Sequence, residues 1–124
     1  MEKYNPLKQP IPEEWLELDE DERICLVRDF HETFNEMPED ALNLHTMFHV
    51  IVENQIAGNV EFIRETIAKL IRQGLDRHDA VHAIASIVCE DIFDLTKGNK
   101  QEFSAKQYRR KLEKITAKRW RKGQ

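Results

Sequence analysis

Apolar residues recur every three or four positions along most of the chain, and strict apolar–polar alternation is absent. The first spacing places side chains on one face of an α-helix, whereas alternation is typical of strands. The pattern therefore predicts an all-α, single-domain helical bundle of five to six helices. These helices are expected at residues 12–17, 20–35, 39–57, 60–73, 77–97 and 104–120.

Residues that favour helix ends support these boundaries. Asp76, Ser104 and Asn59 are good N-caps for the helices that follow them. Gly58, Gly74 and Gly98 each follow a long periodic segment, where glycine ends helices because it tolerates positive φ. Residues 1–11 carry no helical pattern and are expected to form an extended arm.

Length and composition exclude several classes of protein. With 124 residues, the whole chain 1–124 is expected to form one domain. No apolar run approaches the ~20 residues of a membrane span, and the first residues lack the apolar core of a signal peptide. Two cysteines are too few for a disulfide-rich scaffold. A cytoplasmic location without membrane contact is therefore expected.

Charge is distributed unevenly along the chain. Residues 1–40 hold 13 acids and 4 bases, whereas residues 106–124 hold nine Lys/Arg and one acid. The basic C-terminal helix and tail, residues 104–124, is thus a candidate contact surface for an acidic protein or a nucleic acid. Its candidate partner-binding residues are Arg109, Arg110, Lys114, Lys118, Arg119, Trp120 and Arg121. The alternative is a solvated amphipathic helix with no partner.

The histidines are the most informative residues of the sequence. His45 and His49 share the apolar face of the 39–57 helix, and His78 and His82 repeat this i,i+4 arrangement on the 77–97 helix. Short connections favour antiparallel packing, so these two helices are expected to face each other. Each pair can direct two ring nitrogens at one point, and Glu53 lies one turn beyond His49.

Two interpretations of this pattern remain open. In the first, the protein binds a transition metal, such as zinc, iron, nickel or copper, through His45, His49, Glu53, His78 and His82. If the ion keeps an open position, it can activate water for hydrolysis, with Glu53 as ligand or general base. In the second, the histidines form a buried hydrogen-bonded network without a metal. His31, on the apolar side of the 20–35 helix, is expected to be structural.

Other motifs on the second histidine helix are weaker. His78-Asp79 is an HD dipeptide, as in metal-dependent phosphohydrolases, and residues 78–82 are a near-match to the zinc-protease HExxH motif, with Asp in place of Glu. Cys89 is expected to be a small buried apolar residue, and the acidic edge that includes Asp91 is expected to be a solvated face.

The two histidine segments carry a resemblance. LNLHTMFHVIVENQIAGN and RHDAVHAIASIVCEDIFD resemble a family of small bacterial proteins that form a domain of unknown function. Its pattern is His-x-x-x-His-x-x-x-Glu-x-Gln on one helix and Arg-His-Glu-Ala-x-His on a later one. The similarity covers about residues 42–95, and Asp79 departs from the expected Glu. The resemblance implies that the two helices belong together, and it implies no reaction.

Overall fold

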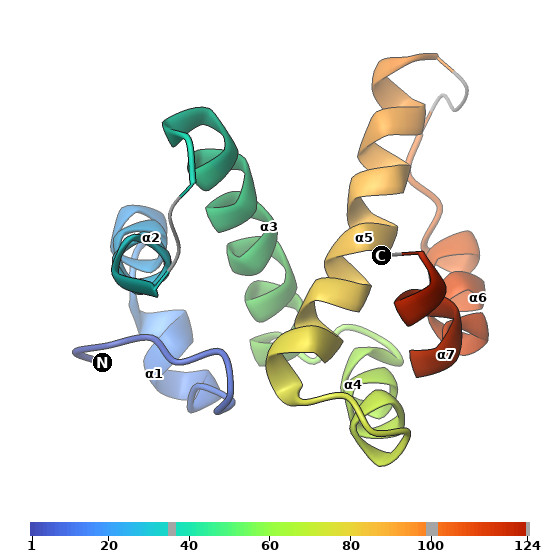
Figure 1. Cartoon of the computed structure of the whole chain (residues 1–124), viewed down its shortest axis with the longest axis horizontal. Coiled ribbons are helices and arrows are strands. Elements are labelled where there is room, and N and C mark those ends of the chain that lie inside the picture. The colour runs from blue at the N-terminus through green and yellow to red at the C-terminus, as the bar shows by residue number, and fades with distance from the viewer. Residues whose placement is uncertain (35–36, 99–101, 124) are drawn as a thin grey trace. The chain divides into compact units, whose positions relative to one another are not determined.

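The computed structural model describes residues 1–34, 37–98 and 102–123, and this part of the chain is all-α, with seven helices and no strand. The predicted fold class, a single-domain helical protein, is confirmed. The helices are α1 Pro12–Glu17, α2 Glu20–Phe34, α3 Glu39–Ala57, α4 Ile63–Arg72, α5 Arg77–Thr96, α6 Ala105–Lys114 and α7 Ala117–Lys122 (Figure 1). None of these helices combines the length and apolar character that crossing a bilayer requires.

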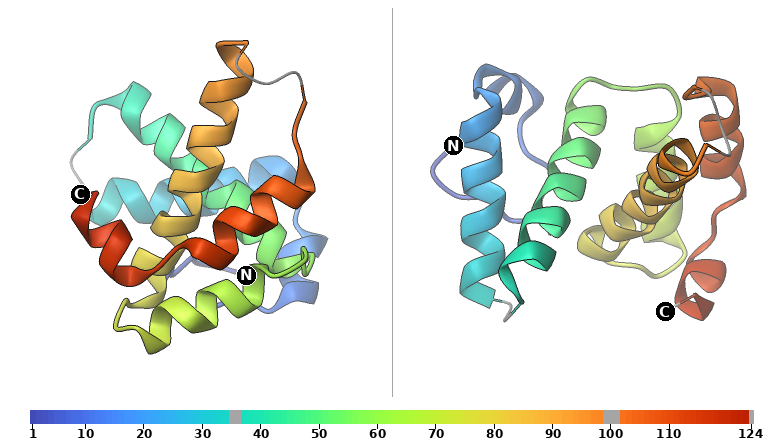
Figure 2. Two further views of the ribbon diagram at one scale, coloured as in Figure 1. Left: turned by 90° about the vertical axis from the view of Figure 1, so that its right-hand side faces the viewer. Right: turned by 90° about the horizontal axis from the view of Figure 1, so that it is seen from above.

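The chain divides into two compact units, which are described separately. Unit 1 is Met1–Val60 and unit 2 is Glu61–Gln124. In unit 1, α1 and α2 both pack against α3, and the right-hand view of Figure 2 shows α2 beside α3. In unit 2, α4, α5 and α6 pack against one another.

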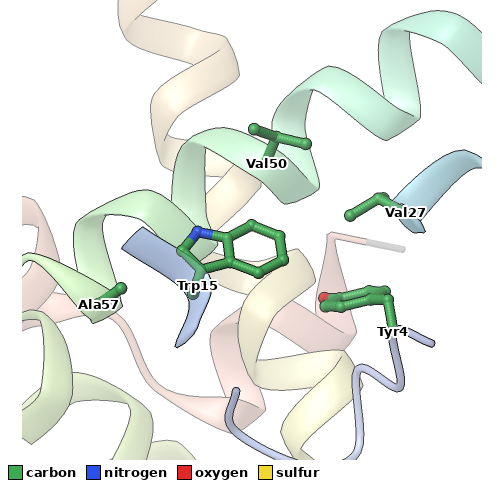
Figure 3. Close-up of a cluster of buried hydrophobic side chains, with 5 residues drawn as sticks. All are labelled: Tyr4, Trp15, Val27, Val50 and Ala57. Carbon is green, nitrogen blue, oxygen red and sulfur yellow. The ribbon is translucent and has the colours of Figure 1, made fainter. Parts of the chain in front are cut away.

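The core of unit 1 gathers side chains from all three of its helices and from the N-terminal segment. Its buried members are Tyr4, Trp15, Val27, Val50 and Ala57 (Figure 3). Residues 1–11 are non-helical, as expected, but they are not extended throughout, because Lys8 N–H donates to the Asn5 carbonyl in a turn. Burial of Tyr4 fastens this segment to the unit.

Trp15 joins α1 to both of its neighbours. Its indole N–H donates to Asn54 Oδ1 on α3 at 2.9 Å. Arg23 on α2 donates to the same oxygen and to the carbonyls of Trp15 and Leu16, where α1 ends. These bonds satisfy carbonyls that the end of a helix leaves without partners. A six-residue helix, too short to be stable alone, is thereby held in place.

Of the N-caps predicted for α4 and α5, the one for α5 is confirmed and the one for α4 is wrong. Asp76 caps α5 as expected, since its Oδ1 accepts from Asp79 N–H at 2.7 Å. The prediction for Asn59 is wrong: α4 begins at Ile63, after Asn59 and Phe62 have both taken left-handed conformations with φ of 52° and 69°. A helix cannot pass through such residues, so α4 starts three residues later than predicted.

Glycine follows the helical segment at all three expected places, with Gly58 as the C-cap of α3, but only two of the three glycines have positive φ. Gly74 and Gly98 have φ of 105° and 76°, which other residues rarely adopt. Gly58 follows α3 with φ of −79°, so the positive φ expected there is absent.

The helix predicted at 104–120 is two helices. Ser104 caps α6, as expected, but Ile115 is extended and Thr116 caps α7 by accepting from Arg119 N–H. Contacts from α4 make the break favourable, because Lys69 donates to the carbonyls of Leu112 and Glu113 and Gln73 Oε1 accepts from Ala117 N–H. Burial lowers the pKa of Lys69, and the nearby Glu113 carboxylate opposes that shift.

The Asp76 cap provides a test of the local structure of unit 2. Asp76→Ala leaves Asp79 N–H without its side-chain acceptor, so the free energy of unfolding is expected to fall by about 1 kcal/mol. Urea unfolding followed by circular dichroism measures this change. Asp76→Asn, which keeps an acceptor oxygen, is the control and is expected to cost less; equal losses in the two variants would contradict the capping role.

Candidate metal centre

Three histidines of unit 1 lie together on two helices. His31 comes from α2, and His45 and His49 come from successive turns of α3. The ring centroids are 4.6 Å apart for His31 and His45, 4.5 Å for His31 and His49, and 4.8 Å for His45 and His49. One ring nitrogen from each lies within 4.8 Å of the others. These three residues are called the three-histidine cluster below.

His31 was expected to be structural, and the structure instead places it among the candidate ligands. It is fully buried, as is His49, whereas His45 is half-buried. The sequence showed that His31 lies on the apolar side of its helix. It did not reveal a shared site, because no histidine lies four residues before or after His31. Its partners are on α3, and only the packing of α2 against α3 brings the rings together.

The hydrogen bond of His31 identifies its basic nitrogen. Nδ1 lies 2.8 Å from the Val27 carbonyl oxygen, one turn earlier on α2. A carbonyl oxygen only accepts, so Nδ1 carries the proton and Nε2 holds the lone pair of the neutral ring. Histidines that bind metals commonly donate their second N–H to a backbone carbonyl in this way.

A second hydrogen-bond chain runs from His49 to a carboxylate. The Tyr4 hydroxyl donates to Glu53 Oε2 at 2.5 Å and lies 3.2 Å from His49 Nδ1. Since its single proton is given to Glu53, the hydroxyl oxygen accepts from His49 Nδ1–H. The basic nitrogen of His49 is then Nε2, as in His31. The sequence pattern did not reveal Tyr4, because it lies in a non-helical segment remote from the histidines in sequence.

Glu53 is the last residue of this hydrogen-bond chain, in which Tyr4 connects it to His49. Its side chain is fully buried, and its Oε2 accepts from Tyr4. A carboxylate in this position orients the ligand histidine and increases its basicity. The predicted role of Glu53 as a direct ligand or general base stays a prediction.

His78 and His82 form the histidine pair of unit 2. Both lie near the start of α5 and are half-buried, and their ring centroids are 4.2 Å apart. One ring nitrogen from each lies within 4.8 Å of the other. The i,i+4 spacing thus brings the two rings together, as predicted.

Two expectations for the remainder of α5 are wrong. Cys89 is exposed instead of buried, because the side of α5 that carries it is not covered at that turn. Asp91 is only 3% exposed instead of solvated, because Lys111 on α6 reaches across and donates to its Oδ1 at 2.6 Å.

The basic residues of the C-terminal segment differ in their partners and surroundings. Arg109 pairs with Glu61 and Glu113, and Arg121 donates to the Gly74 carbonyl. Lys114, Arg119 and Trp120 line a cavity of unit 2. The other two predicted contact residues, Arg110 and Lys118, are exposed.

Comparisons with known proteins give no relative: no family model, no curated protein and no solved structure matches the chain. The resemblance to a bacterial family of unknown function therefore stays a prediction. A function has to be inferred from the geometry of the site.

Proposed function

We propose that this protein binds a divalent transition-metal ion through the three-histidine cluster of unit 1. The observation that carries the proposal is the proximity of three imidazoles, two of them fully buried, with ring centroids 4.5–4.8 Å apart. Imidazole nitrogens gathered this closely are a common donor set for a transition-metal ion.

The hydrogen bonds support the same assignment. His31 Nδ1 is occupied by the Val27 carbonyl and His49 Nδ1 by the Tyr4 hydroxyl, so both rings offer Nε2 as ligand. Three imidazoles suit zinc, copper, nickel or iron. At a Zn–N distance of about 2.1 Å, ligand nitrogens of a tetrahedral site lie about 3.4 Å apart. Small rotations of the rings would bring the cluster to that spacing.

His78 and His82 of unit 2 are proposed as metal ligands in their own right, because of their sequence pattern and their spacing on α5. Two imidazoles one turn apart provide a bidentate unit of the kind that transition metals bind. A His78→Ala/His82→Ala variant tests this part of the proposal separately. Loss of zinc affinity or of bound zinc supports it, and unchanged affinity and stoichiometry would exclude the pair as ligands.

Zinc titration of the full chain, prepared without a histidine tag, tests the proposed function. We expect at least one zinc ion per chain and, at 100 times the dissociation constant, stabilisation by about 2.7 kcal/mol, or roughly 10 °C in Tm. Binding should weaken as the pH falls below about 6.5, because protons compete for imidazole nitrogens. A chain that binds no zinc and gains no stability from it would refute the proposal.

Tyr4→Phe tests the role of the Tyr4 hydroxyl, which accepts a hydrogen bond from His49 Nδ1–H. This change removes the bond to Glu53 Oε2 and the acceptor for His49 Nδ1–H while keeping the buried ring. Zinc affinity is expected to fall by about 10-fold to 100-fold, since the partners that orient a metal ligand commonly contribute that much. Calorimetric titration measures the change.

A matched control separates the hydroxyl from general effects on the core. Trp15 contacts the Tyr4 ring at 6.0 Å between centroids, and Trp15→Phe alters the same packing without touching the hydrogen bonds of the Tyr4 hydroxyl. It should destabilise unit 1 with little change in zinc affinity. Equal affinities for Tyr4→Phe and the wild type would contradict the role given to the hydroxyl.

A further inference from the structure

A cavity of about 360 Å³ lies within unit 2, where α7 folds back beside α5 and α6. It exists because the predicted helix 104–120 breaks at Ile115, which brings α7 residues to the same hollow as α6 residues. This volume lies at the low end of the range for small-molecule sites, about 300–1,000 Å³. The residues lining this C-terminal cavity are Ser86, Ile87, Glu90, Lys111, Lys114, Ile115, Arg119, Trp120 and Gly123.

The cations of the C-terminal cavity differ in how far the protein neutralises them. Lys111 donates to Asp91 at 2.6 Å and lies 3.5 Å from Glu90. Burial lowers the pKa of Lys111, but the hydrogen bonds and charges of Asp91 and Glu90 outweigh it and raise the pKa above its ordinary value. Lys111 is thus committed to these carboxylates.

Lys114 and Arg119 are in a different position. Neither side chain forms an ion pair with any residue in the described part of the chain. Their charges are therefore not neutralised by an ion pair, because Glu90, the acid among the lining residues, instead pairs with Lys111. Arginine and lysine together are a common means of holding a phosphate group, arginine through paired N–H donors and lysine as a point charge.

The remaining wall of the C-terminal cavity is apolar and aromatic. Trp120 is half-buried and shares the lining with Ile87 and Ile115. A lining indole beside cations is suited to stacking against a flat ring, as aromatic side chains do in nucleic-acid recognition. Glu90 supplies an acceptor that a ribose hydroxyl or an amino group can use.

We propose that the C-terminal cavity binds a small phosphorylated molecule with an aromatic ring, of the size of a nucleoside monophosphate. Lys114 and Arg119 hold the phosphate, and Trp120 stacks on the ring. A nucleic-acid strand is disfavoured, because Arg109 and Arg121, two of the cations that would contact its backbone, are bonded within the protein. This site is independent of the metal proposal.

AMP is the probe, and its binding to the wild-type chain is measured by calorimetry and by the fluorescence of tryptophan. We expect AMP to quench Trp120, and adenosine and inorganic phosphate each to bind about tenfold or more weakly than AMP, because each lacks one half of the contacts. Amide chemical shifts on AMP addition should change at residues 114–120. Absence of AMP binding, or equal affinities for AMP and phosphate, would overturn the proposal.

Two double variants, each of which removes one lysine and one arginine, test whether the cations of the cavity hold the phosphate. Lys114→Gln/Arg119→Gln is expected to weaken AMP binding by about tenfold or more. Arg110→Gln/Lys118→Gln removes one arginine and one lysine from exposed positions outside the cavity and should leave the affinity within about twofold. Equal losses in the two variants would reveal only non-specific attraction and would overturn the site. Circular dichroism verifies that both variants remain helical.

Discussion

Replacing His49 with alanine is expected to lower the zinc affinity of the chain by about 100-fold or more. Structural zinc sites gain about 10–16 kcal/mol from roughly four ligands, so one imidazole is worth about 3 kcal/mol or more. Of the three proposed ligands, His49 is the one most firmly held by its surroundings, because it is fully buried and bonded through Tyr4 to Glu53. The loss is measured by zinc titration against a competing chelator at neutral pH.

Val50→Ala is the matched control for this variant. Val50 is the next residue on α3, is fully buried and belongs to the unit 1 core, but it offers no ligand atom. The Val50 variant should unfold more easily than the wild type and keep its zinc affinity within a few-fold. If both variants lose zinc to the same extent, disruption of the fold explains the loss and His49 is not a ligand.

Trp15→Ala is expected to reduce the free energy of unfolding by about 3–5 kcal/mol, the largest loss of stability predicted for this chain. Its side chain is completely buried and contacts Tyr4 at 6.0 Å between ring centroids. The substitution leaves a cavity, removes the indole donor to Asn54 and loosens the packing of α1 against α3. Urea unfolding followed by circular dichroism gives the value.

Trp15→Phe distinguishes the volume of this side chain from its hydrogen bond. It keeps most of the buried ring and loses only the N–H donor, so it should cost roughly half as much as Trp15→Ala or less. A loss below about 1 kcal/mol for Trp15→Ala would contradict the central place of Trp15 in unit 1.

The sequence predicted helices well where capping and periodicity agreed. The ranges 12–17 and 39–57 match α1 and α3, and the Asp76 cap sets the start of α5. The prediction from sequence failed where contacts between residues distant in sequence decide the conformation. Thr116 is a local N-cap signal, but the break between α6 and α7 is also stabilised by Lys69 and Gln73, which lie far away in sequence.

The candidate site was likewise predicted only in part, because local spacing could be read from the sequence and tertiary packing could not. The i,i+4 pairs are a local property of one helix, so His45 and His49 could be identified from spacing alone. His31 lies on a different helix and Tyr4 precedes the first one, and both reach the site only through tertiary packing. Hydrogen-bond direction, which assigns Nε2 as the basic nitrogen of His31 and His49, is likewise visible only in three dimensions.

X-ray absorption at the zinc edge, recorded on the zinc-loaded full chain, tests the metal proposal most directly. Coordination by the three-histidine cluster predicts at least three nitrogen neighbours at about 2.0–2.1 Å, with the multiple-scattering pattern of imidazole rings. In His49→Ala, that pattern should show one imidazole fewer per zinc. A shell made of oxygen alone, or an imidazole count unchanged by the substitution, would contradict it.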